Sequence, residues 1–185
     1  MRDEIMPSAP AGVRSRRQLI AGMAMALGAL AATKAVASRQ TAAKENPGAA
    51  PDPRRTTLHY QVGFKATPQR IYEVLLDAKL FAACTGLPAE IDPAAGGAFS
   101  LFGGQIKGRN VELVPNQRIV QAWRPGHWDP GVYSIVRFEL KPRGAESTLI
   151  LDHAGFPAGD AAGLDSGWHE HYLDTLQKYF AQPAK

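Results

Sequence analysis

The chain has a single cysteine, Cys84, among its 185 residues, which excludes a scaffold held together by disulfides. It has no internal repeat, and no uncharged apolar run reaches the ~20 residues that a membrane-spanning helix needs. Hydrophobic residues make up 45% of the chain and charged residues 21%, which is an ordinary globular balance. The composition favours one globular domain and argues against collagen-like, coiled-coil and fully disordered chains.

The first 37 residues resemble an export signal. Arg16 and Arg17 stand just before the uncharged run Leu19–Ala32, whose 14 residues are too few to span a bilayer. Ala35-Val36-Ala37 has the small-x-small pattern of a cleavage site. This order is similar to a bacterial twin-arginine (Tat) signal, so we expect a periplasmic or otherwise exported protein that is cleaved after Ala37. An amphipathic helix of the domain and a retained membrane anchor stay open as alternatives.

The basic residues are concentrated outside the expected domain. Of the formal net charge of +4, residues 1–37 contribute +3, residues 38–55 contribute +2 and Lys185 contributes +1, whereas residues 56–182 carry −2. Residues 38–55 are rich in Ala and Pro, which is typical of a disordered linker. We therefore expect the folded domain at residues 56–182, and the positive charge gives no indication of a nucleic-acid partner.

The pattern of apolar residues and turns predicts an α+β fold. Apolar and polar residues alternate over 57–64, as in a half-buried strand, and Thr67-Pro68 then suit the start of a helix. A second short helix is expected over 78–84, and a final helix from about 165 to 180 follows a glycine-rich loop. Turn signals between them predict strands near 90–92, 98–102, 105–113, 117–124, 133–140 and 147–153.

The expected architecture is a curved antiparallel sheet of about six to seven strands. Two short helices follow the first strand, and a long C-terminal helix packs across the sheet. Four stretches of the domain resemble the helix-grip fold of the START-like (SRPBCC) superfamily, and within it the homologues of the activator of heat-shock-protein-90 ATPase. The four stretches are Thr67–Leu75, Pro93–Phe99, Gly108–Arg124, and Thr148–Phe156 followed by Gly167-Trp168.

The resemblance implies a fold more sharply than it implies a function. The superfamily includes lipid carriers, hormone and pigment binders, cyclases, oxygenase domains and chaperone activators, so the fold does not select among these activities. The activated chaperone is cytosolic and driven by ATP. An exported protein would meet neither, so the family's name is not carried over as an activity.

Aromatic side chains and one histidine are expected between the sheet and the last helix. Leu149, Leu151 and His153 share one face of their strand, so an inward leucine face would turn His153 inward too. If these side chains line a cavity, its aromatic walls suit a small apolar or amphipathic ligand. The alternative is that the side chains fill the core completely. Likewise, His153 is either a polar anchor for the ligand or a satisfied buried histidine. The expected cavity residues are Phe99, Trp123, Phe138, His153, Trp168 and Tyr172.

No residue pattern predicts a metal or a cofactor. His169 and His171 are two positions apart on a helix and so point to different sides. Cys84 has no neighbouring His or Asp to activate it and is expected to be a packed thiol. The loop His127–Pro130 is expected to be an exposed connection at one end of the sheet, with a cavity lid or a partner contact as the alternatives.

Three functions stay open at this point. The first is binding of a small apolar or amphipathic ligand, and the second is a protein-interaction module that resembles a chaperone ATPase activator domain and has a periplasmic partner. The third is a cofactor-free enzyme of the cyclase or hydrolase type that uses His153 or Asp152 as acid–base. No paired carboxylates and no nucleophile–base dyad support it, so an enzyme is the less favoured reading. Nucleic acid and stable membrane insertion after signal cleavage are not expected, and the sequence leaves the oligomeric state open.

Overall fold

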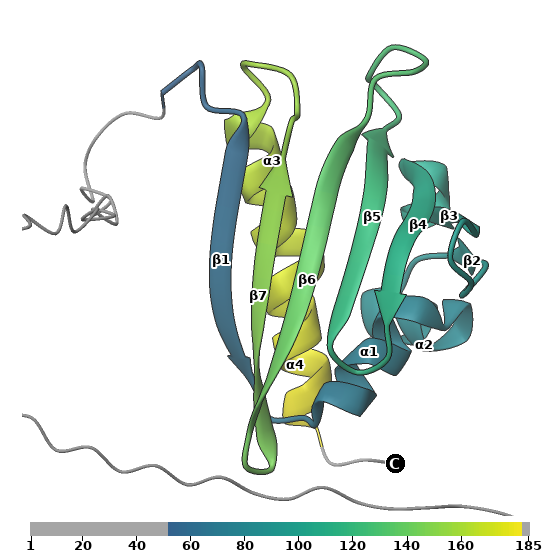
Figure 1. Cartoon of the computed structure of the whole chain (residues 1–185), viewed down its shortest axis with the longest axis vertical. Coiled ribbons are helices and arrows are strands. Elements are labelled where there is room, and N and C mark those ends of the chain that lie inside the picture. Colours follow the sequence, from purple (N-terminus) through teal and green to yellow (C-terminus); the bar gives the residue numbers. More distant parts are fainter. Residues whose placement is uncertain (1–51, 183–185) are drawn as a thin grey trace, which may run out of the picture. The chain divides into compact units, whose positions relative to one another are not determined.

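The computed structural model describes residues 52–182, which include the whole domain expected at 56–182 (Figure 1). The predicted export signal and most of the predicted linker lie outside the described residues. Seven strands form one antiparallel sheet in the order β1-β7-β6-β5-β4-β3-β2. The strands are β1 (Thr57–Phe64), β2 (Glu90–Ile91), β3 (Ala98–Leu101), β4 (Ile106–Val114), β5 (Arg118–Pro125), β6 (Ser134–Arg143) and β7 (Glu146–Ala154).

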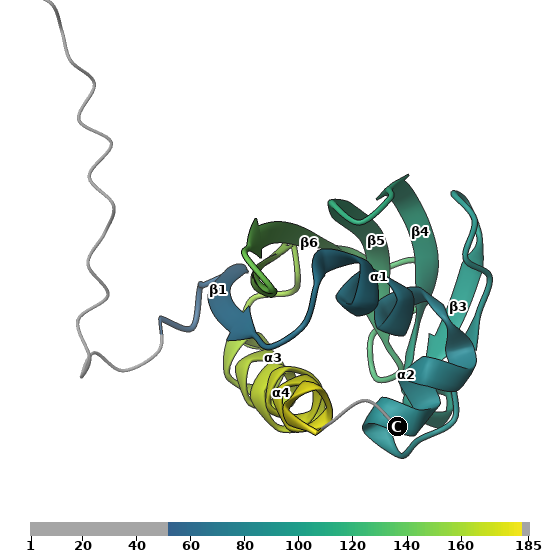
Figure 2. The same ribbon diagram turned by 90° about the horizontal axis from the view of Figure 1, so that it is seen from below.

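The first strand closes the sheet against the last one. β1 pairs with β7, so that Leu58 lies opposite His153, and the other strands follow one another as hairpins. Figure 2 shows the sheet curving around the helices, which all lie on its concave side. The predicted α+β architecture with a curved antiparallel sheet is therefore confirmed, and the number of strands is seven.

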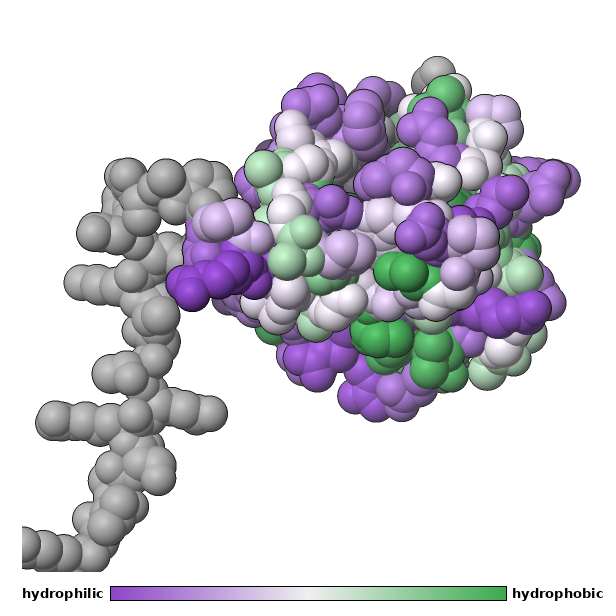
Figure 3. All heavy atoms as spheres, turned by 90° about the horizontal axis from the view of Figure 1, so that it is seen from above, coloured by the Kyte–Doolittle hydropathy of each residue, from purple (hydrophilic) through white to green (hydrophobic). Residues whose placement is uncertain are grey.

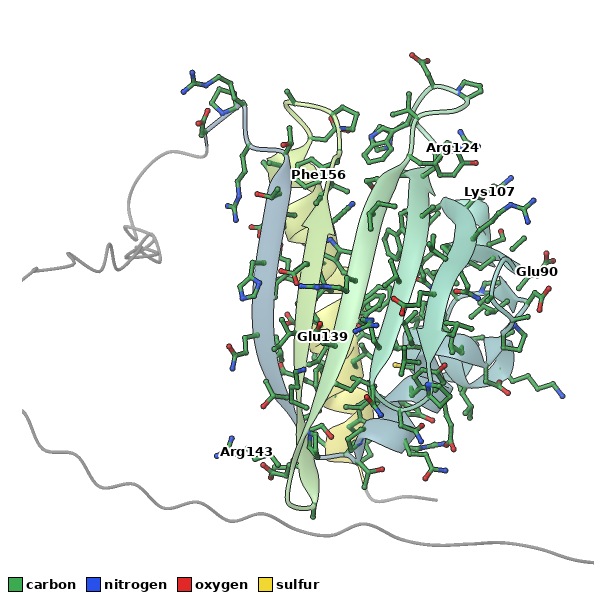
Figure 4. All side chains as sticks on the ribbon, viewed as in Figure 1. Glu90, Lys107, Arg124, Glu139, Arg143 and Phe156 are labelled. Atoms are coloured by element: carbon green, nitrogen blue, oxygen red, sulfur yellow. The ribbon has the colours of Figure 1, made fainter. Side chains whose placement is uncertain are left out.

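The two faces of the sheet follow the alternation of the sequence. On β6, the side chains of Val136 and Phe138 are fully buried under the helices, whereas Arg137 between them points outward. The outward face carries ion pairs, because Arg137 contacts Asp152 at 2.8 Å and Glu139 at 3.5 Å. Glu139 is labelled on this outer face in Figure 4. The expected interior position of Phe138 is therefore confirmed.

Two short helices, α1 (Pro68–Leu76) and α2 (Ala78–Thr85), connect β1 to β2. The Thr67 hydroxyl accepts a hydrogen bond from the amide of Arg70 at 3.3 Å and so caps α1, as the Thr-Pro pair predicts. The Asp77 carboxylate caps α2 by accepting from the amides of Lys79 and Leu80 at 2.8 and 2.9 Å. Gly86, with φ 74°, ends α2.

The last helix begins earlier than predicted. It runs through α3 (Ala161–Gly167), a π-helical turn (Trp168–Leu173) and α4 (Asp174–Ala181). The start expected near residue 165 was wrong because Ala161-Ala162-Gly163 continues a glycine-rich loop and carries no helix-start signal of its own. None of the helices in the described range is both long and apolar enough to cross a membrane.

Gly108 on β4 lets two large rings meet across the sheet. It lies opposite Phe99 of β3 on one side and Trp123 of β5 on the other. A Cβ atom at this position would overlap the Phe99 ring and the carbonyl oxygen of Ala122. Without a side chain at position 108, Phe99 lies over β4 and its ring centre comes within 6.4 Å of the Trp123 ring.

Candidate functional site

An aromatic cluster lies between the π-helical turn and the concave face of the sheet. The rings of Trp123 and Trp168 stack with their centres 4.7 Å apart, and Tyr172 meets Trp168 edge to face at 4.9 Å. Tyr172 also stacks on Phe138 at 5.9 Å. With Phe99 beside Trp123 and the ring of His153 centred 6.1 Å from it, the structure brings all six predicted cavity residues into one cluster.

His153 is fully buried, and both of its ring nitrogens have partners. The Trp168 indole N–H donates to Nδ1 at 3.0 Å, so Nδ1 accepts and the ring proton lies on Nε2. Nε2–H therefore donates to the Ser134 hydroxyl at 2.7 Å, and that hydroxyl donates to the backbone carbonyl of Trp123 at 3.3 Å. Burial lowers the pKa of His153 to about 4, which keeps the ring neutral at physiological pH.

The sequence leaves open whether His153 is a polar anchor for a ligand or a buried histidine with all its hydrogen bonds made within the protein. The geometry is that of the second. His153 orients the indole of Trp168 and has no nitrogen free for a ligand. Asp152, its neighbour, lies on the outer face and contacts His59 at 2.6 Å and Arg137 at 2.8 Å. Partial burial raises the pKa of Asp152, but the hydrogen bonds from His59 and Arg137 outweigh it and lower the pKa. The two candidate acid–base residues therefore face opposite sides of the sheet.

A second chain of buried hydrogen bonds fixes the other indole. Trp123 donates through Nε1 to Gln121 at 2.9 Å, and the Gln121 amide donates to Asn110 at 2.9 Å. The Asn110 amide ends the chain on the backbone carbonyl of Asp92 at 2.8 Å. Sequence reasoning missed Gln121 and Asn110, although Gln121 lies between Ile119 and Trp123 in an inward alternation that could have indicated it.

An open pocket of about 520 Å³ borders the aromatic cluster, at the end of the sheet where β5 leads into β6. Trp123, Trp168 and Tyr172 are among the buried residues of its wall, together with Phe102 and Pro125, whereas Phe99, Phe138 and His153 are not among its lining residues. Figure 3 looks onto this end of the domain and shows hydrophobic side chains gathered among hydrophilic ones. The lining residues are Leu87, Phe102, Gln105, Ile106, Trp123, Pro125, Gly126, His127, Gly159, Asp160, Gly163, Leu164, Gly167, Trp168, His171 and Tyr172.

The hydroxyl of Tyr172 is the notable polar group of the buried wall. Only 3% of the residue is exposed, and no hydrogen bond to this hydroxyl is found among residues 52–182. Every fully enclosed side-chain nitrogen or oxygen of the described residues has a partner, so the Tyr172 hydroxyl is not fully enclosed, and Tyr172 is one of the residues that line the pocket. Burial, together with the nearby Cys84, raises the pKa of Tyr172, so the hydroxyl keeps its proton. Burial likewise raises the pKa of the Cys84 thiol to about 11.

Side chains of the loop between β5 and β6 contact Asp160, the residue just before α3. Trp128 is buried, and its indole N–H donates to the carboxylate of Asp160. Arg124 donates to the backbone carbonyl of Trp128 at 3.1 Å, and the ring of His127 lies 3.6 Å from Asp160. The expectation of an exposed connection is therefore wrong for Trp128, because its side chain is buried and its indole N–H binds Asp160, which lies 32 residues further along the chain.

The part of the chain that the structure describes contains no group of three or more His, Cys, Asp or Glu side chains that could hold a metal ion. His169 and His171 diverge, since the His169 ring lies against Tyr60 with their centres 5.4 Å apart and the His171 ring lies beside Phe102 at 6.5 Å. What the site offers is shape, apolar surface and a few polar groups.

The seven-stranded sheet wrapped around a C-terminal helix defines a helix-grip domain of the START-like (SRPBCC) class. Residues 65–181 match the family described as Activator of Hsp90 ATPase homolog 1-like protein, and the chain belongs to this family. The resemblance noted from sequence motifs is confirmed at this level.

Known proteins share this domain at low identity. An activator of 90 kDa heat shock protein ATPase homolog from Dictyostelium discoideum is 31% identical over 134 residues, which are 72% of this chain and 35% of that protein. The human homolog 1 is 27% identical over 122 residues, which are 66% of this chain and 36% of that protein. The chain thus spans about a third of the length of these relatives.

Solved structures share the same fold. An HSP90 activator from Plasmodium falciparum superposes with a TM-score of 0.66 at 25% identity, over 71% of this chain and all of that chain. The protein CalU16 from Micromonospora echinospora superposes with a TM-score of 0.58 at 21% identity, over 69% of this chain and 76% of that chain, which shows the fold alone.

Proposed function

We propose that this protein, after export, binds a small and mainly apolar or amphipathic molecule in the pocket between the β5 end of the sheet and α3. The observation that carries the proposal is that Tyr172 lines the pocket, is buried, and has a hydroxyl with no hydrogen-bond partner among residues 52–182. A polar group in such a place is costly unless something hydrogen-bonds to it, and a bound ligand would supply that partner.

The size and lining of the pocket support a small ligand. A volume of about 520 Å³ lies within the range of small-molecule sites. Its buried wall is aromatic, and its polar side chains, such as Gln105, Asp160 and His171, come from less buried positions. Enclosing an apolar ligand that buries on the order of 200 Å² would contribute about 5 kcal/mol before ordering costs, a scale that allows micromolar affinity.

The rigidity of the wall also supports the proposal. The two stacked indoles are each held by a hydrogen bond, Trp123 by Gln121 and Trp168 by His153. Their orientation is therefore set before a ligand arrives, which reduces the entropic cost of binding.

A thermal-shift screen of the purified protein against uncharged aromatic and lipid-like compounds tests this function. Compounds that stabilise the protein should lose their effect in Gly163→Leu, which places a side chain in the pocket, and should keep it in Ser166→Leu, an exposed position of the same helix. The proposal fails if no compound stabilises the protein, or if Gly163→Leu responds as the wild type does.

The comparisons favour a second candidate, a protein-interaction module. The relatives from Dictyostelium and human are named as activators of the 90 kDa heat shock protein ATPase, although this chain matches only about a third of each. Because an exported protein would not meet that cytosolic chaperone, the partner would be a different, periplasmic protein. This function predicts a stoichiometric partner that co-purifies with the wild type and with Gly163→Leu alike.

A further inference from the structure

Two glycines of the helical run lie on the pocket wall. Gly163 and Gly167 are one turn apart on α3 and share the face that leads to Trp168 and Tyr172. Glycine inside a helix is unfavourable relative to alanine, because it loses more backbone freedom on folding. Two of them on one face therefore need a reason.

Neither the backbone nor the packing provides that reason. Gly167 has φ −61° and ψ −39°, ordinary helical values that alanine adopts readily, and Gly163 has no positive φ either. A Cβ atom at either position would meet nothing within 4 Å. The pocket glycine Gly159 differs, since its φ of 99° requires glycine. The absence of side chains at Gly163 and Gly167 therefore leaves space open in the pocket.

Tyr172 follows Gly167 in the π-helical turn of the same helical run, and its side chain ends in a hydroxyl. It is nearly fully buried, it keeps its proton, and it has no hydrogen-bond partner among the described residues. A protonated phenol donates a hydrogen bond well, so it suits an acceptor such as a carbonyl oxygen. A charged group at this depth would be disfavoured by the apolar surroundings.

Building on the proposed function, we infer that the ligand is a flat, uncharged aromatic compound with a hydrogen-bond acceptor at its inner end. The flat face lies on the bare backbone of α3 at Gly163 and Gly167, where a side chain would lift it away. Phe102 and Ile106 add apolar surface to the pocket lining, and the acceptor reaches the Tyr172 hydroxyl. The two glycines and Tyr172 are thus the specificity-determining residues of the site.

Three matched probes separate these features. Fluorenone is a flat aromatic ketone, fluorene has the same flat shape without the carbonyl, and dicyclohexyl ketone has a carbonyl but no flat surface. We expect the wild-type protein to bind fluorenone about three- to tenfold more tightly than fluorene, as one hydrogen bond provides, and to bind dicyclohexyl ketone more weakly than either. Isothermal titration calorimetry measures all three affinities.

The variants then assign each preference to its residue. Tyr172→Phe should lower fluorenone affinity to that of fluorene and leave fluorene binding unchanged. Gly163→Ala and Gly167→Ala should each weaken both flat probes at least fivefold, while raising the melting temperature by about 1–4 °C because alanine favours the helix. Ser166→Ala, on the exposed side of α3, should leave all three affinities unchanged.

The inference is overturned if the alanine variants bind the flat probes as well as the wild type does, or if fluorenone and fluorene bind equally. It is also overturned if the wild type binds none of the three probes. In that last case the proposed function still stands when another compound stabilises the wild type and loses its effect in Gly163→Leu. If no compound does so, the proposed function fails as well.

Discussion

The neutral state of His153 makes the stability of the fold depend on pH in a defined window. The ring is fully buried and its pKa falls from 6.5 to about 4 because burial disfavours the charged form. Protonation would also place a second proton on Nδ1, facing the indole N–H of Trp168 that now donates to it. The folded state therefore resists a proton that the unfolded chain accepts.

The size and direction of the effect follow from linkage. Because the pKa is lower in the folded state, the neutral ring contributes its full stability above pH 6.5, and that contribution is lost as the pH falls from about 6.5 to about 4. A difference of this size between the folded and unfolded pKa corresponds to about 3 kcal/mol. Below pH 4 this residue should cause no further loss.

Urea unfolding at pH values from 7.5 to 3.5 measures this loss. The variant His153→Gln has no titrating ring, so its free energy of unfolding should fall by about 3 kcal/mol less than that of the wild type over this range. His169→Gln, at a histidine whose side chain is 52% exposed, is the matched substitution for comparison. The NMR signals of the His153 ring give an independent readout, since they should not titrate above about pH 5.

The reasoning would be refuted if His153→Gln kept the same pH dependence as the wild type, or if the ring signals of His153 titrated near pH 6.5. Either result would mean that His153 reaches solvent, and the hydrogen bonds to Trp168 and Ser134 would then not describe the protein in solution.

Two further substitutions test how the fold is built. Gly108→Ala should destabilise the protein by about 1–3 kcal/mol in urea unfolding, because the new Cβ would overlap the Phe99 ring, whereas Gly63→Ala, where a Cβ meets nothing within 4 Å, should not show this steric loss. An equal effect at the two sites would contradict the packing described for Gly108. Asp77→Ala should cost about 1 kcal/mol through loss of the α2 cap, and Asp77→Asn, which keeps a capping oxygen, should cost clearly less.

Much of the sheet can be predicted from the sequence because strand faces alternate with a period of two. The inward positions of Leu149, Leu151 and His153 on β7 and of Phe138 on β6 follow from that alternation alone. The same rule places the charged Arg137 outside.

The partners of the inward polar residues could not be predicted in the same way. Ser134 meets His153 because of the register between β6 and β7, and Asn110 meets Gln121 because of the register between β4 and β5. Register depends on turn geometry and on packing over the whole sheet, which a single sequence does not state. The inward position of His153 could therefore be expected from the sequence. The hydrogen bonds of its two ring nitrogens to Trp168 and Ser134 could not.

The pocket wall on α3 was missed for a related reason. Ala161-Ala162-Gly163 has the composition of the preceding loop, and its helical state depends on contacts with the rest of the domain, including the buried side chain of Ala161. Predicting a helix start near residue 165 hid the fact that Gly163 and Gly167 share a helical face. The aromatic residues of the pocket wall, Trp123, Trp168 and Tyr172, could be predicted from the sequence. The contribution of Gly163 and Gly167 to that wall could not.

Native mass spectrometry of the protein purified under mild conditions from its own cells tests the central claim most directly. We expect the wild type to carry a small molecule of one defined mass that is released on denaturation and is absent from Gly163→Leu purified in the same way. A wild-type protein with no bound small molecule, or one that instead carries a stoichiometric protein partner also retained by Gly163→Leu, would contradict the account.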